Sequence, residues 1–229
     1  ADGQGYRGDG FTHIFVIPDG GGTPRQLTDG DYNHGAPEWT PDSQKIIFSG
    51  VRKPGAEYQR NDSEIYSLQL SDSHITPLTD RKGPDSNPRV SPDGRFIAYT
   101  GYDQTDDTYT VSKLNVMEID GKNKRTLTSG FDRAPGGLIW ATDTSGVYFM
   151  TEDRGSDYLC FVPLKGRAVQ TLTRSNQQLA ISSIAQNGLA AGTLASPSEP
   201  GDVVAFNLKQ PTPKKLTDVN GDLLEGRKL

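Results

Sequence analysis

One stretch decides the fold because the chain repeats it: Glu38-Trp39-Thr40-Pro41-Asp42-Ser43-Gln44-Lys45-Ile46-Ile47-Phe48-Ser49-Gly50. The next copy occupies residues 88–100, a third copy without the proline occupies 139–149, and a degraded fourth copy occupies 184–191. In the first two copies a proline presets φ at the second position of a turn, and an Asp followed by Ser or Gly completes the turn between two strand-like segments. Each copy therefore predicts a β-hairpin.

A second motif, the dipeptide Leu-Thr, follows each hairpin. Its five copies are Leu27-Thr28, Leu78-Thr79, Leu127-Thr128, Leu172-Thr173 and Leu216-Thr217, at steps of 51, 49, 45 and 44 residues. Ten positions before each leucine stands an apolar residue: Ile17, Leu68, Met117, Val162 and Phe206. The interval from each threonine to the next turn Asp or Asn is nearly constant, so the length variation falls between the second and third strand of a unit. A period in the forties with four short strands indicates a β-propeller blade.

These repeats predict an all-β chain that forms a β-propeller of four-stranded blades. The expected units are a half blade at residues 1–28, complete blades at about 35–79, 86–128, 135–173 and 179–217, and an exit linker at 218–229. Closed propellers usually contain more than four sheets, and an open stack leaves strand edges unpaired. We therefore expect part of a larger propeller, with open blade edges through which the chain could self-associate.

Composition narrows the classes of partner. A net charge of −5 and the absence of a Lys/Arg cluster argue against nucleic acid. The single cysteine, Cys160, excludes an intrachain disulfide, and its apolar neighbours predict a buried thiol. No apolar run approaches the ~20 residues that span a bilayer, so no membrane span is expected. These features leave the compartment open between cytoplasm and periplasm.

The sequence predicts no catalytic, cofactor-binding or metal-binding residue. A Gly-x-Ser-x-Gly elbow is absent. The three histidines, His13, His34 and His74, lie in different units without ligand spacing, which favours surface or turn roles. Arg133 is expected to pair with carbonyls or with a turn Asp of a neighbouring blade. Trp39 and Trp140 occupy equivalent positions of two units and are expected to be packing residues.

Several ordered motifs carry a family resemblance. They are Arg25-Gln26-Leu27-Thr28, Pro37-Glu38-Trp39-Thr40-Pro41-Asp42, Ser91-Pro92-Asp93-Gly94 and Lys215-Leu216-Thr217-Asp218-Val219-Asn220, with the segment 107–117 followed by Asp132-Arg133 and Trp140. This set resembles the propeller of the prolyl oligopeptidase family of serine peptidases, in particular its acylaminoacyl-peptidase and dipeptidyl-peptidase branch, over essentially the whole chain. The resemblance implies a C-terminal α/β-hydrolase domain that supplies the catalytic residues, none of which lies in this chain.

The resemblance also implies a role for the propeller as a gate that admits only short or unfolded peptides to the hydrolase. Two long loops, 51–63 and 101–113, are expected to project from the same propeller face. We hypothesise that they contact the hydrolase domain or the incoming peptide. The candidate contact residues are Arg52, Tyr58, Arg60, Tyr102 and Tyr109.

Two alternatives come from other functional classes. One is a freestanding Tol-type scaffold that binds a protein partner through its loops. The other is a propeller lyase that acts on sugars, which would need His and acidic residues clustered at one mouth of the channel. The scattered histidines argue against the lyase.

Overall fold

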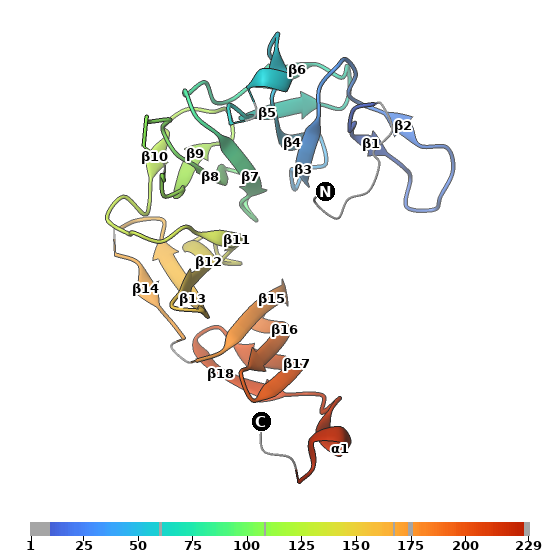
Figure 1. Ribbon diagram of the computed structural model, residues 1–229. Helices are drawn as coiled ribbons and strands as arrows, with labels where there is room; N and C mark the ends of the chain where they lie inside the picture. The colour runs from blue at the N-terminus through green and yellow to red at the C-terminus, as the bar shows by residue number, and fades with distance from the viewer. Residues whose placement is uncertain (1–9, 60, 108, 167, 174–175, 227–229) are drawn as a thin grey trace.

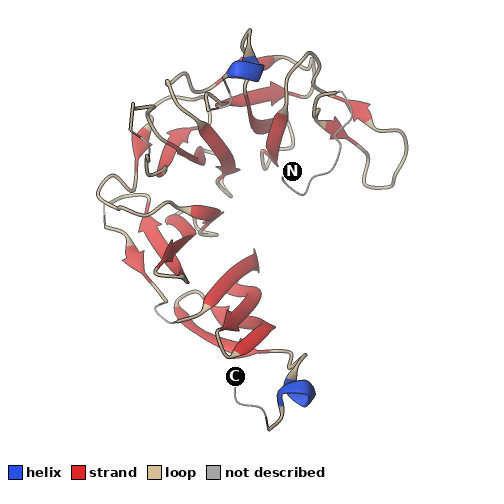
Figure 2. Ribbon diagram, in the orientation of Figure 1, coloured by secondary structure: helices blue, strands red, loops and turns tan. Residues whose placement is uncertain are grey.

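The computed structural model describes residues 10–59, 61–107, 109–166, 168–173 and 176–226. Its strands form five antiparallel sheets, one of two strands and four of four strands, that follow one another along an open arc (Figure 1). Two short helical segments, at Ala56–Tyr58 and α1 (Gly221–Leu224), are the only helices in the described part of the chain (Figure 2). The predicted all-β propeller of four-stranded blades, with one partial blade, is confirmed.

Within each sheet the strands are paired in chain order. The first sheet contains β1 (Phe15–Val16) and β2 (Arg25–Gln26). The second contains β3 (His34–Trp39), β4 (Lys45–Gly50), β5 (Glu64–Gln69) and β6 (Ile75–Pro77), and the third contains β7 (Asp85–Val90), β8 (Phe96–Gly101), β9 (Lys113–Glu118) and β10 (Arg125–Thr126). The fourth contains β11 (Gly136–Trp140), β12 (Gly146–Asp153), β13 (Ser156–Pro163) and β14 (Gln170–Thr171). The fifth contains β15 (Gln178–Ile184), β16 (Leu189–Ser196), β17 (Glu199–Asn207) and β18 (Gln210–Lys215).

The Leu-Thr repeat has a physical cause. In all five sheets the threonine Oγ1 accepts the backbone N–H of the residue fourteen positions earlier, at 2.8–2.9 Å. The preceding leucine donates its own N–H to the carbonyl of that same residue, at 2.8 Å. The dipeptide therefore fastens the end of the outermost strand to the chain of the strand beside it, which fixes the interval between them.

The recurrence of Asp or Asn in the hairpin turns is also explained by a local hydrogen bond. Oδ1 of Asp42, Asp93 and Asp143 accepts the N–H two residues later, and Asn187 does the same. The intervening residue always has positive φ, at 57°, 71°, 58° and 80° for Ser43, Gly94, Thr144 and Gly188. This is an Asx turn closed through the left-handed region, which explains why Gly or a small polar residue follows the acid.

The hydrophobic core lies between the sheets rather than within a single sheet. One buried cluster joins each neighbouring pair, for example Ile65 and Leu78 of the second sheet with Ile97 and Tyr99 of the third. Four of the apolar residues ten positions before the Leu-Thr leucines are at most 3% exposed, whereas Ile17 of the two-stranded sheet is 52% exposed. Each of the four buried residues packs against the preceding sheet, whereas no described sheet precedes that of Ile17, so burial at this position depends on a sheet before it.

The two tryptophans show the same dependence. Trp140 is buried, and its Nε1 donates to the carbonyl of Arg89 in the preceding sheet at 2.8 Å. Trp39 is 48% exposed, because the sheet before it has two strands and offers no inner strand to cover the ring. The expectation of a packing role is correct for Trp140 and wrong for Trp39.

Candidate functional site

Both long loops and the connections between sheets lie at one end of the blades. The register pairs Gly50 with Glu64 and Gly101 with Lys113, so both long loops leave from this end, and His34 pairs with Gly50, so the inter-blade connections arrive there too. We call it the loop face. It comprises the described residues of 51–63, 102–112, 154–155 and 197–198 and of the connections 29–33, 80–84, 129–135 and 176–177. Because β18 runs in the same direction as β6 and β10, the chain that follows it also begins on the loop face.

The expected contact residues on the loop face differ in their surroundings. Tyr58 and Tyr109 are 87% and 77% exposed, so their rings are presented to solvent. Tyr102 is half-buried, and its N–H donates to the Pro84 carbonyl at 3.3 Å. Arg60 lies outside the described residues.

Arg52 folds back onto the protein instead of projecting. Its guanidinium lies 5.0 Å from the centre of the Tyr32 ring, and Nη1 lies 2.5 Å from Nε2 of His34 and 3.4 Å from the Asp29 carbonyl. Its side chain therefore links the loop 51–63 to the connection between the first two sheets.

The two long loops meet at the connection between the second and third sheets. From the loop 51–63, Asp62 Oδ1 accepts the Gly83 N–H at 3.3 Å. From the other loop, the Gln104 N–H donates to the Lys82 carbonyl at 2.8 Å, and Asp103 lies 3.6 Å from Arg81. The prediction that both loops share one face is confirmed, and the residues 81–85 join them.

Beneath that meeting point the structure buries two acidic side chains, Glu64 and Asp85, which are 1% and 0% exposed. Burial raises the pKa of Asp85 to about 7 and also raises the pKa of Glu64. Lys53 Nζ contacts Glu64 Oε1 at 3.2 Å and Arg81 Nε contacts Asp85 Oδ1 at 2.9 Å. Sequence reasoning did not single out this pair.

An equivalent pair of histidines occupies the junction between the first two sheets. The rings of His13 and His34 lie 5.4 Å apart, and His34 is 4% exposed. The expected surface role is therefore wrong for His34. Its Nδ1 lies 2.9 Å from the Thr12 carbonyl, and burial lowers its pKa. The repeat contained the missed signal, because His13 and Glu64 each stand fifteen positions before a Leu-Thr threonine, and His34 and Asp85 each stand six after it.

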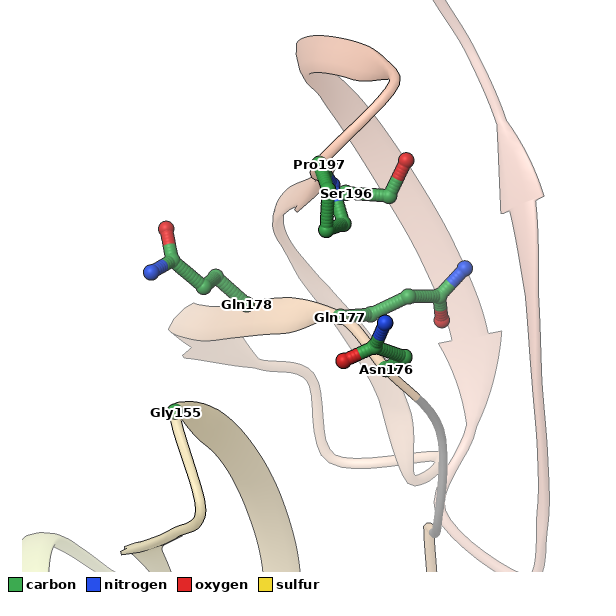
Figure 3. A pocket seen from close by; sticks show the side chains of 6 residues that line it. All are labelled: Gly155, Asn176, Gln177, Gln178, Ser196 and Pro197. Atoms are coloured by element: carbon green, nitrogen blue, oxygen red, sulfur yellow. The ribbon is translucent and has the colours of Figure 1, made fainter.

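The fourth and fifth sheets have tight turns in place of long loops, and their part of the loop face is hollowed. A cavity of about 410 Å³ is lined by Phe131, Asp132, Arg133, Thr151, Asp153, Arg154, Tyr158 and Thr171. In it Arg133 pairs with the carboxylates of Asp153 and Asp132, each at 2.8 Å, and donates to the Asp132 carbonyl at 3.2 Å. Its charge is therefore paired as expected, with a carbonyl and with carboxylates of its own blade rather than with a turn Asp of a neighbouring blade. A smaller cavity, of about 130 Å³, lies between the hairpin tips of the two sheets and the start of β15 (Figure 3).

The inner side of the arc carries a further hollow of about 490 Å³. Its wall comes from β3, β7, β11 and β15, the innermost strand of each complete sheet (Figure 1). Glu38 and Arg89 form an ion pair across it at 3.0 Å, and Trp140, Leu138 and Ile181 supply apolar surface.

Among the described residues no group of three or more His, Cys, Asp and Glu side chains is arranged to hold a metal ion. No described helix is long and apolar enough to cross a bilayer.

Comparison with known proteins identifies the family to which this propeller belongs. The family described as the TolB beta propeller domain, PD40, matches residues 6–186, which is well over half of the chain. The chain belongs to the TolB β-propeller family.

Relatives of this propeller include peptidases. The dipeptidyl-peptidase 5 of Porphyromonas gingivalis is 24% identical over 189 residues, covering 82% of this chain and 28% of the relative. A puromycin hydrolase structure superposes with a TM-score of 0.73 at 19% identity, covering 90% of this chain and 35% of that one. TolB from Acinetobacter baumannii superposes with a TM-score of 0.67 at 18% identity, covering 90% and 48%. The two structural matches show the fold alone, and the chain spans less than a third of its curated peptidase relative. The predicted resemblance to peptidase propellers is confirmed.

Proposed function

We propose that this chain is the non-catalytic propeller portion of a serine peptidase that cleaves short peptides, of the acylaminoacyl- or dipeptidyl-peptidase type, and that its loop face gates and selects the peptide. The observation that carries the proposal is the concentration on one face of both long loops, the inter-blade connections and the segment after β18. A hydrolase domain joined after β18 would start on this face. The relative named dipeptidyl-peptidase 5 supports the assignment.

In this arrangement the propeller performs no covalent chemistry. Its sheets exclude large folded substrates by bulk, while the loop face supplies contacts to a peptide that has entered. Tyr58 and Tyr109 are suited to that role, since exposed aromatic rings bury large area at small cost in side-chain entropy. A contact made only with the correct peptide changes kcat/KM for that peptide relative to others.

The test uses the full-length protein. Tyr58→Ala, Tyr109→Ala and the double variant are compared with the parent over peptides of increasing length and varied N-terminal residues. We expect the ratio of kcat/KM between good and poor peptides to change by about tenfold in the double variant, since lost apolar contacts change discrimination by ~10–200-fold at most. Lys122→Ala, which removes an exposed side chain from the turn after β9 at the opposite end of the blade, serves as the matched control. Identical selectivity in all variants would refute the gating role.

A freestanding Tol-type scaffold is the second candidate, and one observation favours it. The fifth sheet exposes Val203 and Leu216 by 41% and 58%, whereas their counterparts Ile65 and Leu78 in the second sheet are at most 8% exposed. Such a face can accept a partner. Reading the natural coding frame beyond Leu229 separates the candidates. A Gly-x-Ser-x-Gly elbow followed by Asp and His supports the peptidase, and an early stop codon supports the scaffold.

A further inference from the structure

Glu64 and Asp85 stand at the starts of neighbouring strands in two different sheets. Glu64 opens β5 and Asp85 opens β7. The Asp85 N–H donates to the Ser63 carbonyl at 2.7 Å, and the Ser63 hydroxyl donates back to the Asp85 carbonyl at 2.9 Å. Both carboxyls are thus buried between the sheets, with the Thr79 side chain beside both of them.

The hydrogen-bonding capacity of this pair is largely unmet. Of the four carboxyl oxygens, only Glu64 Oε1 receives a hydrogen bond from the described residues, from Lys53 Nζ. Arg81 approaches Asp85 Oδ1 as an ion pair without a hydrogen-bonded alignment. Thr79 already accepts the Ile65 N–H and has a single proton to donate. Buried carboxylate oxygens without hydrogen-bond donors destabilise the folded state. One added proton would turn one of these oxygens into a donor and reduce that free-energy cost.

The surrounding charges agree with one added proton. Three elements face the pair with charged groups: the loop 51–63 through Lys53 and Asp62, the connection through Arg81 and Lys82, and the loop 101–113 through Asp103. Tyr66 and Tyr99 lie beside it with burial-raised pKa values, which keeps both phenols neutral. Lys82 and Asp103 are solvent-exposed and screened. The buried and partly buried groups carry two positive charges, on Lys53 and Arg81, and three negative charges, on Glu64, Asp85 and Asp62, which leaves one negative charge uncompensated.

We propose that Glu64 and Asp85 share one proton in a carboxyl–carboxylate hydrogen bond, and that this proton holds the two long loops closed against the connection 81–85. The proton comes from solvent when the loops close and returns to solvent when they open, with no other bond made or broken. Because burial raises the pKa of Asp85 to about 7, the exchange is expected in the physiological pH range. Two adjacent carboxylates repel each other once the proton is lost.

The contacts already described transmit this change to the loops. Asp85 ends the connection whose Gly83 N–H binds Asp62 and whose Lys82 carbonyl accepts the Gln104 N–H. Displacement of Asp85 from Glu64 therefore loosens both loops together. The loop opening itself does not depend on the proposed peptidase function, whereas its consequence for peptide entry rests on it.

Hydrogen exchange in the full-length protein, followed by mass spectrometry and corrected for the intrinsic pH dependence of exchange, tests the proposal. From about pH 6 to about pH 8, which brackets the titration, we expect protection of residues 51–63 and 101–113 to fall about tenfold in the parent. Asp85→Asn, which donates a hydrogen bond to Glu64 without titrating, should keep the protection of the acidic parent throughout. Asp120→Asn, an exposed change in the turn after β9, should keep the parent's pH dependence.

Infrared difference spectroscopy supplies a second readout. A protonated-carboxyl band should be present in the parent at acidic pH and absent from Asp85→Asn, with Glu64→Gln as the substitute should that variant fail to fold. Protection that does not vary with pH, a parent-like profile in Asp85→Asn, or a missing band would overturn the proposal. Correct exchange behaviour together with unchanged peptide selectivity in the tyrosine variants would refute the gating function alone.

Discussion

The junction between the first and second sheets and the junction between the second and third share one backbone geometry and have opposite chemistry. At equivalent repeat positions the first holds His13 and His34, and the second holds Glu64 and Asp85. A buried threonine at the centre of each, Thr28 or Thr79, accepts the N–H that starts the third strand. The repeat therefore determines which positions contact each other between blades, while the residue types at those positions determine the charge of the junction.

The two junctions also differ in how well their polar groups are satisfied. Both ring nitrogens of His34 have partners, since Nδ1–H donates to the Thr12 carbonyl and Nε2 accepts from Arg52, an arrangement that requires the neutral ring. In the other junction three carboxyl oxygens receive no hydrogen bond from the described residues. At the histidine junction these contacts hold His34 in its neutral form. At the acidic junction the proposed carboxyl pair can exist with or without the shared proton.

The largest expected effect comes from filling the space beside each pair. Gly50 and Gly101 are equivalent, each eight residues after a turn Asp. A Cβ on Gly101 would overlap Asp85 Oδ1 and lie 2.6 Å from the Pro84 carbonyl, whereas on Gly50 the nearest atom is the Asn33 carbonyl at 2.9 Å. We expect Gly101→Ala to lower the free energy of unfolding by about 3 kcal/mol and Gly50→Ala by about 1 kcal/mol, within the range for overpacking.

The urea midpoint of the propeller transition in the full-length protein measures both changes. Gly35→Ala is the control, because no atom lies within 4 Å of the position that its new methyl group would occupy and its φ is not positive. Equal losses for Gly50→Ala and Gly101→Ala would contradict the tighter packing of the acidic junction.

The next effect separates the junctions by the sign of their pH response. Asp85 has a pKa raised to about 7, so its contribution to stability is fully present below its ordinary pKa of about 4 and is lost as pH rises through about 7. His34 has a lowered pKa, so its contribution is present above about 6.5 and is lost as pH falls through the lowered value. Acidification should therefore strengthen one junction and weaken the other.

Unfolding free energies measured from about pH 5 to about pH 8 test these opposite slopes. Asp85→Asn should remove a loss of stability on the order of 2 kcal/mol that develops as pH rises from about 5 to about 7, by linkage. His34→Asn should remove a smaller loss on the acidic side. If the two substitutions change the slope of stability against pH with the same sign, the proposed contrast is wrong.

How far the sequence predicts this molecule depends on the range of the interactions. The Leu-Thr and turn Asp motifs identify the blades because each carries a hydrogen bond to backbone in its own sheet, as Thr79 does to Ile65 and Asp42 does to Gln44. Local sequence determines such contacts. The exposure of Trp39 was not predictable in this way, because it depends on strands of another sheet.

The candidate site was less predictable for the same reason. The loops 51–63 and 101–113 were found from their length, and the exposure of Tyr58 and Tyr109 suits a contact role that stays a prediction. Arg52, a candidate contact residue on a loop expected to project, packs on Tyr32 and His34 across the junction instead. The Glu64–Asp85 pair joins residues of two blades, and only alignment of the repeats onto one another would have brought it out.

The smallest effect concerns the two central threonines. Thr28→Val and Thr79→Val each leave a buried N–H without an acceptor, which should cost about 1.5 kcal/mol of unfolding free energy at acidic pH. The cost of Thr79→Val should grow above about pH 7, because its hydroxyl can donate to a neighbouring carboxylate once the shared proton is gone, and hydrogen bonds to ionised acceptors are the stronger ones. The cost of Thr28→Val, which has no carboxylate partner in the described contacts, should stay constant over that range. Thr76→Val, at an exposed position of β6, controls for the added methyl group. Parallel pH profiles for Thr28→Val and Thr79→Val would mean that the two junctions do not differ in ionisation.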